Sequence, residues 1–271
     1  MARTARIKHE AACVANYHLV SRTNNKMFLF KDPHLRDLLL EALRRVAAFS
    51  GVELLAFAIM SNHFHVVVRV DRTQGPVPEE ELIRRVGVLK GKKEAAALGE
   101  YWAGLRKAGD CERLESEMMC LRRRMNDISA FMKTFKERVN VLYKKENAYC
   151  GSIWSGRFAS TLVEDGAYLE TCLRYAYYNP VRAGIVARAA DYRWCWRRTA
   201  SEEDAYFAGS VPAERLLRRI AQIGAGKVFG GLVFVTLTAF GLGSRFGTRS
   251  VAAHPVGEIG YSTHGWRLAA A

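Results

Sequence analysis

The chain has 271 residues and a formal net charge of +14 at pH 7, because Lys and Arg outnumber Asp and Glu by 41 to 27. Hydrophobic residues make up 49% of the sequence, which is ample for a core, and a charged fraction of 25% is ordinary for a globular protein. We therefore expect one large domain, or one domain with appendages. The positive excess favours a polyanionic partner, most simply nucleic acid, although a basic soluble protein without such a partner has the same charge.

The cysteine pattern argues against a zinc ribbon. The six cysteines are scattered without a Cys-x-x-Cys pair, which is typical of reduced thiols in the cytosol. The first ten residues contain no apolar run of the kind found in signal peptides. We therefore expect a cytoplasmic protein.

The first part of the sequence predicts the order strand, helix, strand. Residues 11–20 are mostly apolar and precede a polar loop, as in a strand. Asp32 and Pro33 are a good N-cap and first-turn pair for a helix, whose apolar residues recur at helical spacing until Gly51. Residues 52–60 predict a second apolar strand.

The third predicted strand, residues 63–70, carries the chemistry. It follows a tight turn at Ser61 and Asn62, and it is rich in β-branched and aromatic residues. Side chains alternate along a strand, so His63 and His65 share one face while the opposite face is entirely apolar. Neighbouring neutral imidazoles are good ligands for a divalent metal, but a His-x-His on a strand is also frequently no metal site.

The middle of the chain predicts helices. Residues 71–120 are polar and mostly helix-forming, and we interpret them as an insertion or a helical hairpin without assigned chemistry. Residues 121–145 combine one apolar face with eight basic and two acidic side chains. Such a helix is usually a solvated outer face, but the bias in sign favours contact with phosphate.

A tyrosine-rich helix is the second predicted element that could carry chemistry. A fourth strand at 158–164 precedes this helix at 166–178, which ends before Pro180. Tyr175 and Asn179 are four residues apart and lie nearly one above the other. If the helix packs across the histidine face, the site combines a metal, an amide oxygen ligand and a phenol nucleophile. Spacing alone is equally consistent with a packing tyrosine and a helix C-cap asparagine.

The sequence beyond residue 200 predicts an appendage. We expect a helix at about 213–223 and an apolar, glycine-rich stretch at 228–242. That stretch is short for a membrane span, which needs roughly twenty residues.

Several motifs together resemble a known family. They are His-Phe-His at 63–65, Gly-Arg-Phe at 156–158 and Tyr-Ala-Tyr-Tyr-Asn-Pro-Val-Arg-Ala-Gly-Ile-Val at 175–186. In this order they are similar to single-tyrosine HUH transposases of the insertion-sequence type, most of all the REP-associated tyrosine transposases. Tyr-His-Leu-Val-Ser-Arg-Thr-Asn at 17–24 also resembles the first strand of that family. The resemblance covers roughly residues 11–198, apart from the insertion.

The resemblance implies an α+β fold with a ferredoxin-like palm. In such a palm, an antiparallel sheet has helices packed on one face, and the histidine strand and tyrosine helix form the active site on the other. A catalytic domain is expected at 1–200, with the helical insertion at about 71–120, and a helical or flexible C-terminal appendage at 201–271.

The resemblance also implies an activity. It is the metal-dependent cutting and rejoining of single-stranded DNA near hairpins, with Mg²⁺ or Mn²⁺, through a 5′-phosphotyrosine. His63, His65 and Asn179 would be the metal ligands, and Tyr175 would be the nucleophile. The four-residue spacing to Asn179 favours Tyr175 over the neighbouring tyrosines.

The expected partner is single-stranded or hairpin DNA, with no membrane and no small-molecule substrate. The protein would act as a monomer or homodimer in the bacterial cytoplasm, associated with the nucleoid. The residues expected to contact phosphates are Arg22, Arg157, Arg182, Arg122, Arg123, Arg124, Lys133 and Lys136.

Two other functions remain open at this point. A domesticated protein that binds nucleic-acid hairpins without turnover would show salt-dependent binding and no cleavage with any metal. A metallohydrolase that uses bound water would stay active in Tyr175→Phe and lose activity in His65→Ala.

Overall fold

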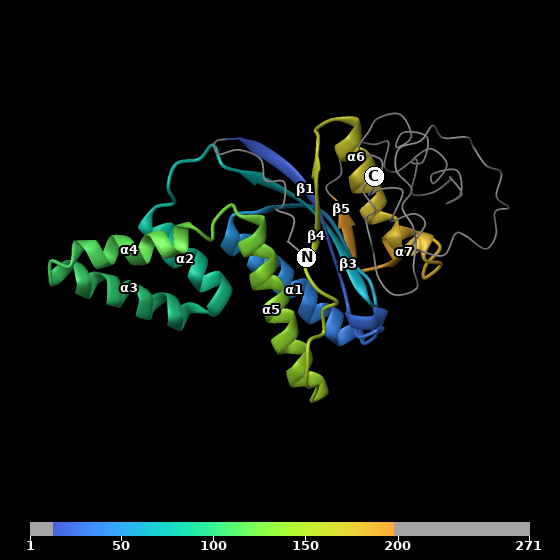
Figure 1. The fold of residues 1–271 in the computed structure, drawn as a ribbon, viewed down its shortest axis with the longest axis horizontal. Coiled ribbons are helices and arrows are strands. Elements are labelled where there is room, and N and C mark those ends of the chain that lie inside the picture. Colours follow the sequence, from blue (N-terminus) through green and yellow to red (C-terminus); the bar gives the residue numbers. More distant parts are fainter. Residues whose placement is uncertain (1–12, 198–271) are drawn as a thin grey trace, which may run out of the picture. The chain divides into compact units, whose positions relative to one another are not determined.

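The computed structural model describes residues 13–197, and the appendage predicted beyond residue 200 lies outside them. The described residues include a five-stranded antiparallel sheet with the strand order β4-β1-β3-β2-β5 (Figure 1). The strands are β1 (Val14–Arg22), β2 (Glu53–Ile59), β3 (His63–Asp71), β4 (Ala159–Val163) and β5 (Cys195–Arg197).

The helices connect the strands in the order of a ferredoxin-like fold, in which β1 and β2 are joined by one helix and β3 and β4 by another. The α-helices are α1 (Pro33–Ser50), α2 (Glu79–Lys90), α3 (Lys92–Lys107), α4 (Cys111–Arg122), α5 (Ile128–Asn147), α6 (Ala167–Tyr177) and α7 (Asn179–Arg182). The central strand order 4-1-3-2 and the helices α1 and α5 confirm the predicted α+β palm, and β5 adds an edge strand.

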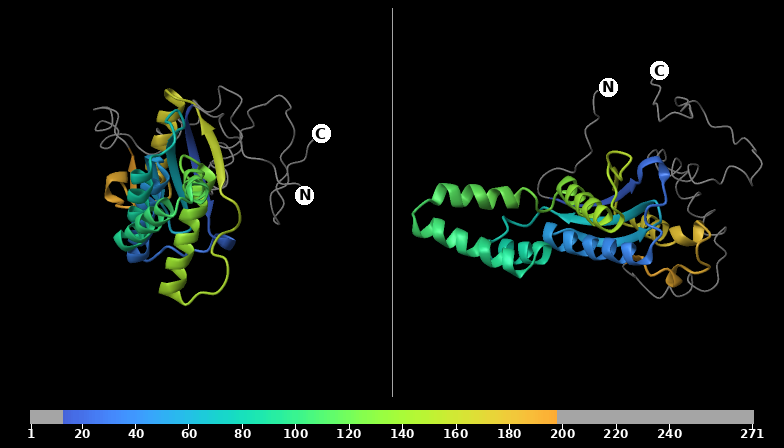
Figure 2. Two further views of the ribbon diagram at one scale, coloured as in Figure 1. Left: turned by 90° about the vertical axis from the view of Figure 1, so that its left-hand side faces the viewer. Right: turned by 90° about the horizontal axis from the view of Figure 1, so that it is seen from below.

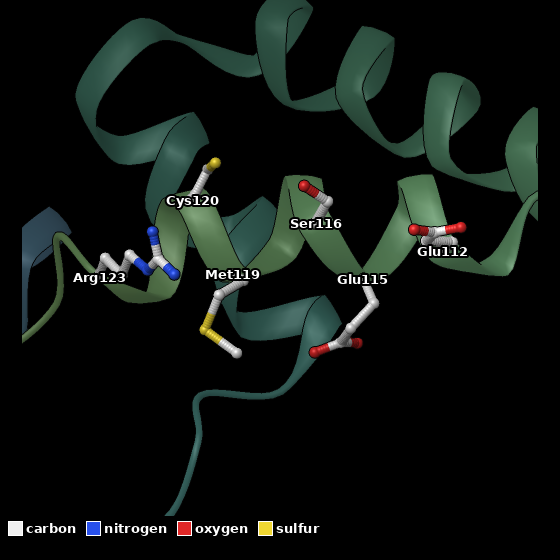
Figure 3. A pocket seen from close by; sticks show the side chains of 6 residues that line it. All are labelled: Glu112, Glu115, Ser116, Met119, Cys120 and Arg123. Atoms are coloured by element: carbon white, nitrogen blue, oxygen red, sulfur yellow. The ribbon is translucent and has the colours of Figure 1, made fainter.

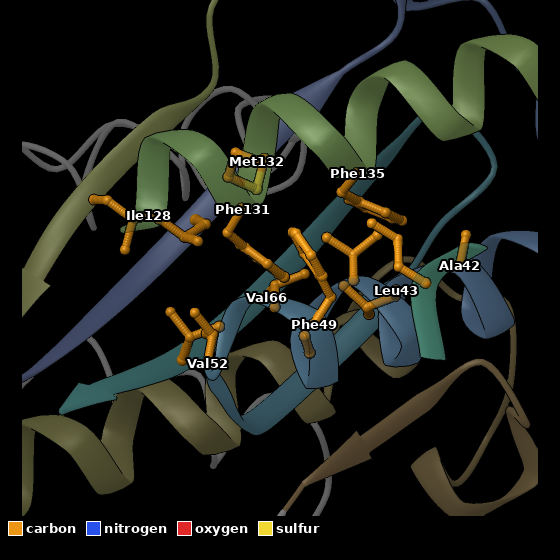
Figure 4. Close-up of a cluster of buried hydrophobic side chains, with 14 of the residues drawn as sticks. Ala42, Leu43, Phe49, Val52, Val66, Ile128, Phe131, Met132 and Phe135 are labelled. Carbon is orange, nitrogen blue, oxygen red and sulfur yellow. The ribbon is translucent and has the colours of Figure 1, made fainter. Parts of the chain in front are cut away.

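The main core lies between the sheet and helices α1 and α5. The apolar face of β3 belongs to this core, as predicted, and Phe64 packs against Phe135 of α5 with ring centroids 5.1 Å apart. Figure 4 shows Phe131 and Phe135 of α5 facing Leu43 and Phe49 of α1. The first helix begins and ends at the predicted residues, because Asp32 caps it and the left-handed backbone at its C-cap suits glycine.

The basic helix begins later than predicted. Instead of a continuous helix over 121–145, α4 ends at Arg122 and α5 starts at Ile128. The break follows from Asp127, whose carboxylate accepts the backbone N–H groups of Ser129 and Ala130 at 2.8 Å and so caps a new helix.

The insertion contains three helices rather than a simple hairpin. Helices α2, α3 and α4 extend beyond one end of the sheet (Figures 1 and 2). Trp102 of α3 is fully buried and belongs, with Leu82 of α2 and Leu114 of α4, to the same core as the sheet. The insertion is therefore packed onto the palm and is not a separate appendage.

The tyrosine-bearing helix packs on the opposite sheet face. Leu169, Leu173 and Ala176 of α6 form a second apolar cluster with Leu55, Ala56 and Val67 of the sheet. Val67 points to this face because it alternates with the core-facing residues of β3. The sheet thus separates the main core from a second layer made by α6.

The role of Phe64 gives a stability prediction. Phe64 is fully buried, whereas Val141 on α5 is 65% exposed. We expect Phe64→Ala to lower the free energy of unfolding by about 3–5 kcal/mol, because it leaves a cavity in the core. The control Val141→Ala is expected to stay within about 0.5 kcal/mol. Urea unfolding measures both, and equal effects of the two substitutions would contradict this core.

Candidate active site between the sheet and α6

The register of β1 against β3 brings basic side chains to the histidine face. Arg22 lies opposite His63, and Val20 lies opposite His65. Opposite residues of an antiparallel pair share a face, so Arg22 and His18 lie on the same face as the two predicted histidines. The strand was predicted to end at residue 20, but pairing with β3 extends it to Arg22.

Three imidazoles form a compact cluster. The His18 ring stacks on the His65 ring with centroids 5.1 Å apart, and His18 Nε2 lies 2.9 Å from His65 Nδ1. The His63 and His65 rings meet edge to face, also at 5.1 Å between centroids. His63 and His65 are buried, and the side chain of Asn179 lies close to His63.

Helix α6 places one tyrosine against this cluster. The Tyr175 ring lies 5.5 Å from the His65 ring and 5.9 Å from the His18 ring, in edge contacts. Its side chain is buried, and its hydroxyl has no hydrogen-bond partner among the described residues. Tyr177 and Tyr178 instead pack on each other and on the segment near Ala189. The structure therefore brings Tyr175, and not its two neighbours, to the histidines.

Asn179 starts a second short helix. Helix α6 ends at Tyr177, close to the predicted end, but the chain turns again as α7, with the Asn179 carbonyl accepting from the Ala183 N–H. Pro180 is tolerated in this first turn, where its missing N–H has no helical partner to lose. Asn179 is thus not a terminal C-cap, and α7 also carries Arg182 into the site.

Two arginines surround the tyrosine. The guanidinium carbon of Arg182 lies 4.6 Å from the centroid of the Tyr175 ring. Its Nε and Nη1 atoms are buried without a hydrogen-bond partner in the part of the chain described. The positive charges of Arg22 and Arg182 both act on His65. The site therefore has a positive potential that suits a phosphate group.

Burial keeps the imidazoles neutral. It lowers the pKa of His18 from 6.5 to about 4, and burial together with the charge of Arg22 lowers the pKa of His63 to about 3. Burial and the neighbouring charged groups hold the pKa of His65 well below its usual value. Burial also lowers the pKa of Arg22, and the neighbouring Tyr175 side chain opposes this shift. Neutral imidazoles are the form that binds metals.

The donor set for a metal consists of two imidazoles and one amide. Among residues 13–197, no group of three or more His, Cys, Asp or Glu side chains has the arrangement of a metal site. His63, His65 and Asn179 do fit a divalent ion, because both rings are neutral and the amide contacts His63. Nitrogen ligands suit Mn²⁺ better than Mg²⁺, which prefers oxygen.

Two of the predicted phosphate contacts, Lys133 and Lys136, lie on a helix away from this cluster. Helix α5, with Lys133 and Lys136, packs in the main core layer, on the sheet face opposite to α6. Lys136 donates to the Gly156 carbonyl, and Arg157 is exposed in the same loop. Arg22 and Arg182 of the predicted set lie beside the histidines and Tyr175.

The three arginines before α5 belong to the insertion and its junction. Arg122 donates to the Val77 carbonyl and pairs with Glu115, while Arg124 lies over the Phe49 ring at 4.7 Å. Arg123 is exposed. It lines a hollow of about 480 Å³ on α4, drawn in Figure 3. The other lining residues are Glu112, Glu115, Ser116, Met119 and Cys120, so this hollow holds none of the predicted catalytic residues.

Sequence reasoning missed His18 as a member of the site. It lies inside an apolar run, and only the pairing of β1 with β3 gives it a partner. The signal available was its spacing, because His18, Val20 and Arg22 alternate on one strand face.

The first part of the chain is similar to one protein family. The family described as "Transposase IS200 like" matches residues 12–110. This confirms the predicted resemblance and supports a transposase, an enzyme that cleaves and rejoins DNA. The matched segment includes β1 and β3 with His18, Arg22, His63 and His65, and it ends before α6. The presence of Tyr175 in the site therefore rests on the structure.

Two solved structures have low sequence identity and low structural similarity to this chain. A REP-associated tyrosine transposase bound to a REP hairpin is 13% identical, with a TM-score of 0.44, over 78% of this chain and 89% of that protein. A transposase candidate from Deinococcus radiodurans is also 13% identical, with a TM-score of 0.33, over 65% of this chain and 97% of the other. No curated protein matches the chain. In residues 13–197, no helix has the length and apolarity needed to cross a bilayer.

The lowered pKa of His18 predicts a pH-dependent stability. Between pH 6.5 and about 4 the unfolded state binds more protons than the folded state, so the free energy of unfolding falls as the pH decreases. The contribution of His18 to this decrease in the free energy of unfolding is on the order of 2 kcal/mol between about pH 6.5 and about pH 5. His18→Gln should remove that share of the pH dependence in urea unfolding. The exposed His34 provides the control His34→Gln, and an equal slope in wild type and His18→Gln would contradict the prediction.

Proposed function

We propose, from the match of residues 12–110 to the IS200-like transposases, that this protein is a metal-dependent single-stranded DNA endonuclease and strand transferase. It would cut near DNA hairpins through a 5′-phosphotyrosine. The observation that supports this most is the buried Tyr175 hydroxyl, which lacks a hydrogen-bond partner in the described part of the chain and lies beside neutral imidazoles and Arg182. A tyrosine that only packs usually satisfies its hydroxyl, so this one suits a reactive role.

Different side chains would bind the metal ion and the phosphate group. His63, His65 and Asn179 would hold Mg²⁺ or Mn²⁺, and the bound ion would polarise the phosphodiester and offset charge on its oxygens. Arg22 and Arg182 would bind the non-bridging oxygens of the scissile phosphate, because the positive charges of both side chains act on His65 in the histidine cluster. Arg182 also lies over the Tyr175 ring and would stabilise negative charge on its oxygen.

The proposed step is an in-line displacement at phosphorus. The Tyr175 oxygen loses its proton and forms a bond to phosphorus, while the bond from phosphorus to the 3′ oxygen breaks. The 3′ oxygen takes up a proton and leaves as a hydroxyl. The protein then remains joined to the 5′ phosphate, and attack by another 3′ hydroxyl rejoins DNA and restores the tyrosine without any co-reactant.

The charge distribution suits a single-stranded or hairpin DNA partner. The net charge of +14 supplies general attraction to phosphates. Arg123, Lys133 and Arg157 are exposed and would position the DNA backbone, whereas Arg122, Arg124 and Lys136 also serve contacts within the protein. We expect action in the bacterial cytoplasm at the nucleoid, as a monomer or homodimer.

The nucleophile can be tested by covalent capture. With Mn²⁺ and a 3′-labelled hairpin oligonucleotide, wild type should form a protein–DNA adduct that survives a denaturing gel. Tyr175→Phe should abolish the adduct while hairpin affinity stays within about threefold, because the substitution removes one oxygen and no charge. The matched control Tyr177→Phe should still form it.

Each other outcome supports a different function. An adduct in Tyr175→Phe would move the nucleophile to another tyrosine. Cleavage without an adduct, kept in Tyr175→Phe and lost in His65→Ala, would support a water-using metallohydrolase. Salt-dependent binding with no cleavage under any metal would support a domesticated hairpin-binding protein.

The role of Arg182 gives a second test. Arg182→Met removes the charge and donors next to Tyr175, and we expect the single-turnover cleavage rate to fall by about 10²–10³-fold. The control is Arg188→Met, because Arg188 is exposed and pairs with Asp191 outside the cluster. An unchanged rate in Arg182→Met would contradict its contact with the scissile phosphate.

A further inference from the structure

Both histidines of the proposed metal pair have the Nδ1 atom engaged by a neighbouring side chain. His63 Nδ1 lies 2.6 Å from Asn62 Oδ1, and His65 Nδ1 lies 2.9 Å from His18 Nε2. Histidines that bind a metal through one ring nitrogen generally donate the N–H of the other nitrogen to an acceptor, which fixes the tautomer and ring orientation. The same arrangement on both rings gives Asn62 and His18 a role beyond packing.

The contact with Asn62 determines the tautomer of His63. Asn62 Nδ2 donates to the Lys26 carbonyl at 3.1 Å, so the amide oxygen is the atom that faces the imidazole. An amide oxygen only accepts hydrogen bonds. His63 Nδ1 therefore carries the proton, and Nε2 carries the lone pair that a metal requires.

The contact with His18 allows the same tautomer for His65. Two imidazole nitrogens 2.9 Å apart share one proton, and donation from His65 Nδ1 to His18 Nε2 leaves the lone pair of His65 on Nε2. Arg22 and Arg182 both bring positive charge to His65. A positive field favours a lone pair over an N–H at the remaining ring nitrogen, so it supports this direction of donation.

We infer that Asn62 and His18 are positioning residues that hold His63 and His65 as Nδ1–H tautomers, with Nε2 of each ring as the metal-binding nitrogen. The inference rests on the proposed metal dependence. The tautomers themselves are properties of the metal-free protein, so they can be measured separately from catalysis.

The first experiment measures the tautomers directly. The metal-free full-length protein, labelled with ¹⁵N-histidine, is studied by long-range ¹H–¹⁵N correlation near pH 7. The signals of His63 and His65 are assigned by their loss in His63→Gln and His65→Gln. We expect the proton on Nδ1 in both rings, and a proton on Nε2 of either ring would overturn the inference.

The second experiment measures Mn²⁺ affinity by electron paramagnetic resonance of the free ion. His18→Leu removes the acceptor and should weaken binding by about 10–100-fold. His18→Gln supplies an amide oxygen as acceptor and should restore most of the affinity. His34→Leu, at an exposed histidine of α1, is the matched control and should bind like wild type.

A variant at Asn62 keeps the inference testable even if His18→Leu fails to fold. Asn62→Ala removes the other acceptor and should cause a similar loss of Mn²⁺ affinity. Unchanged affinity in both His18→Leu and Asn62→Ala, or a His18→Gln variant as weak as His18→Leu, would overturn the positioning role. If wild type has both Nδ1–H tautomers and binds no Mn²⁺, the proposed metal dependence is contradicted and the tautomer assignment stands.

Discussion

The apolar contact between α6 and the sheet is the interaction on which the site depends. Leu169 and Leu173 of α6 pack against Leu55, Ala56 and Val67 of the sheet. Small alanine side chains on both sides allow a close approach, and the burial of the leucines contributes about 1.5–3 kcal/mol each. Because Tyr175 lies next to this apolar stripe, docking of the helix is what brings its ring to the histidines.

The sheet carries two different environments on its two faces. One face packs with α1 and α5 in the large apolar core, while the other combines buried imidazoles, arginines and an asparagine. Burying such polar groups is costly, and the large core supplies the stability that the polar face lacks. The presence of this polar cluster is therefore better explained by a chemical function than by a contribution to the stability of the fold.

Local patterns predicted the parts of the fold that depend on local rules. Strand alternation placed His63 and His65 on one face and Phe64 on the other, and capping residues placed α1. Local patterns failed where the structure depends on pairing between strands. Pairing with β3 extends β1 to Arg22 and gives His18 its partner, and neither follows from β1 alone. The position of α5 on the far face also depends on tertiary packing, so the charge of Lys133 did not reveal its distance from the histidine cluster.

The central claim is that one metal is held where the histidine strand and the tyrosine helix meet. Crystals grown with Mn²⁺, measured for anomalous scattering, test it most directly. The expected map has a single strong peak bonded to His63 and His65, with Asn179 as a further ligand and the Tyr175 hydroxyl beside it. A Mn²⁺ site that excludes the two histidines, or a Tyr175 side chain directed away from them, would contradict the claim.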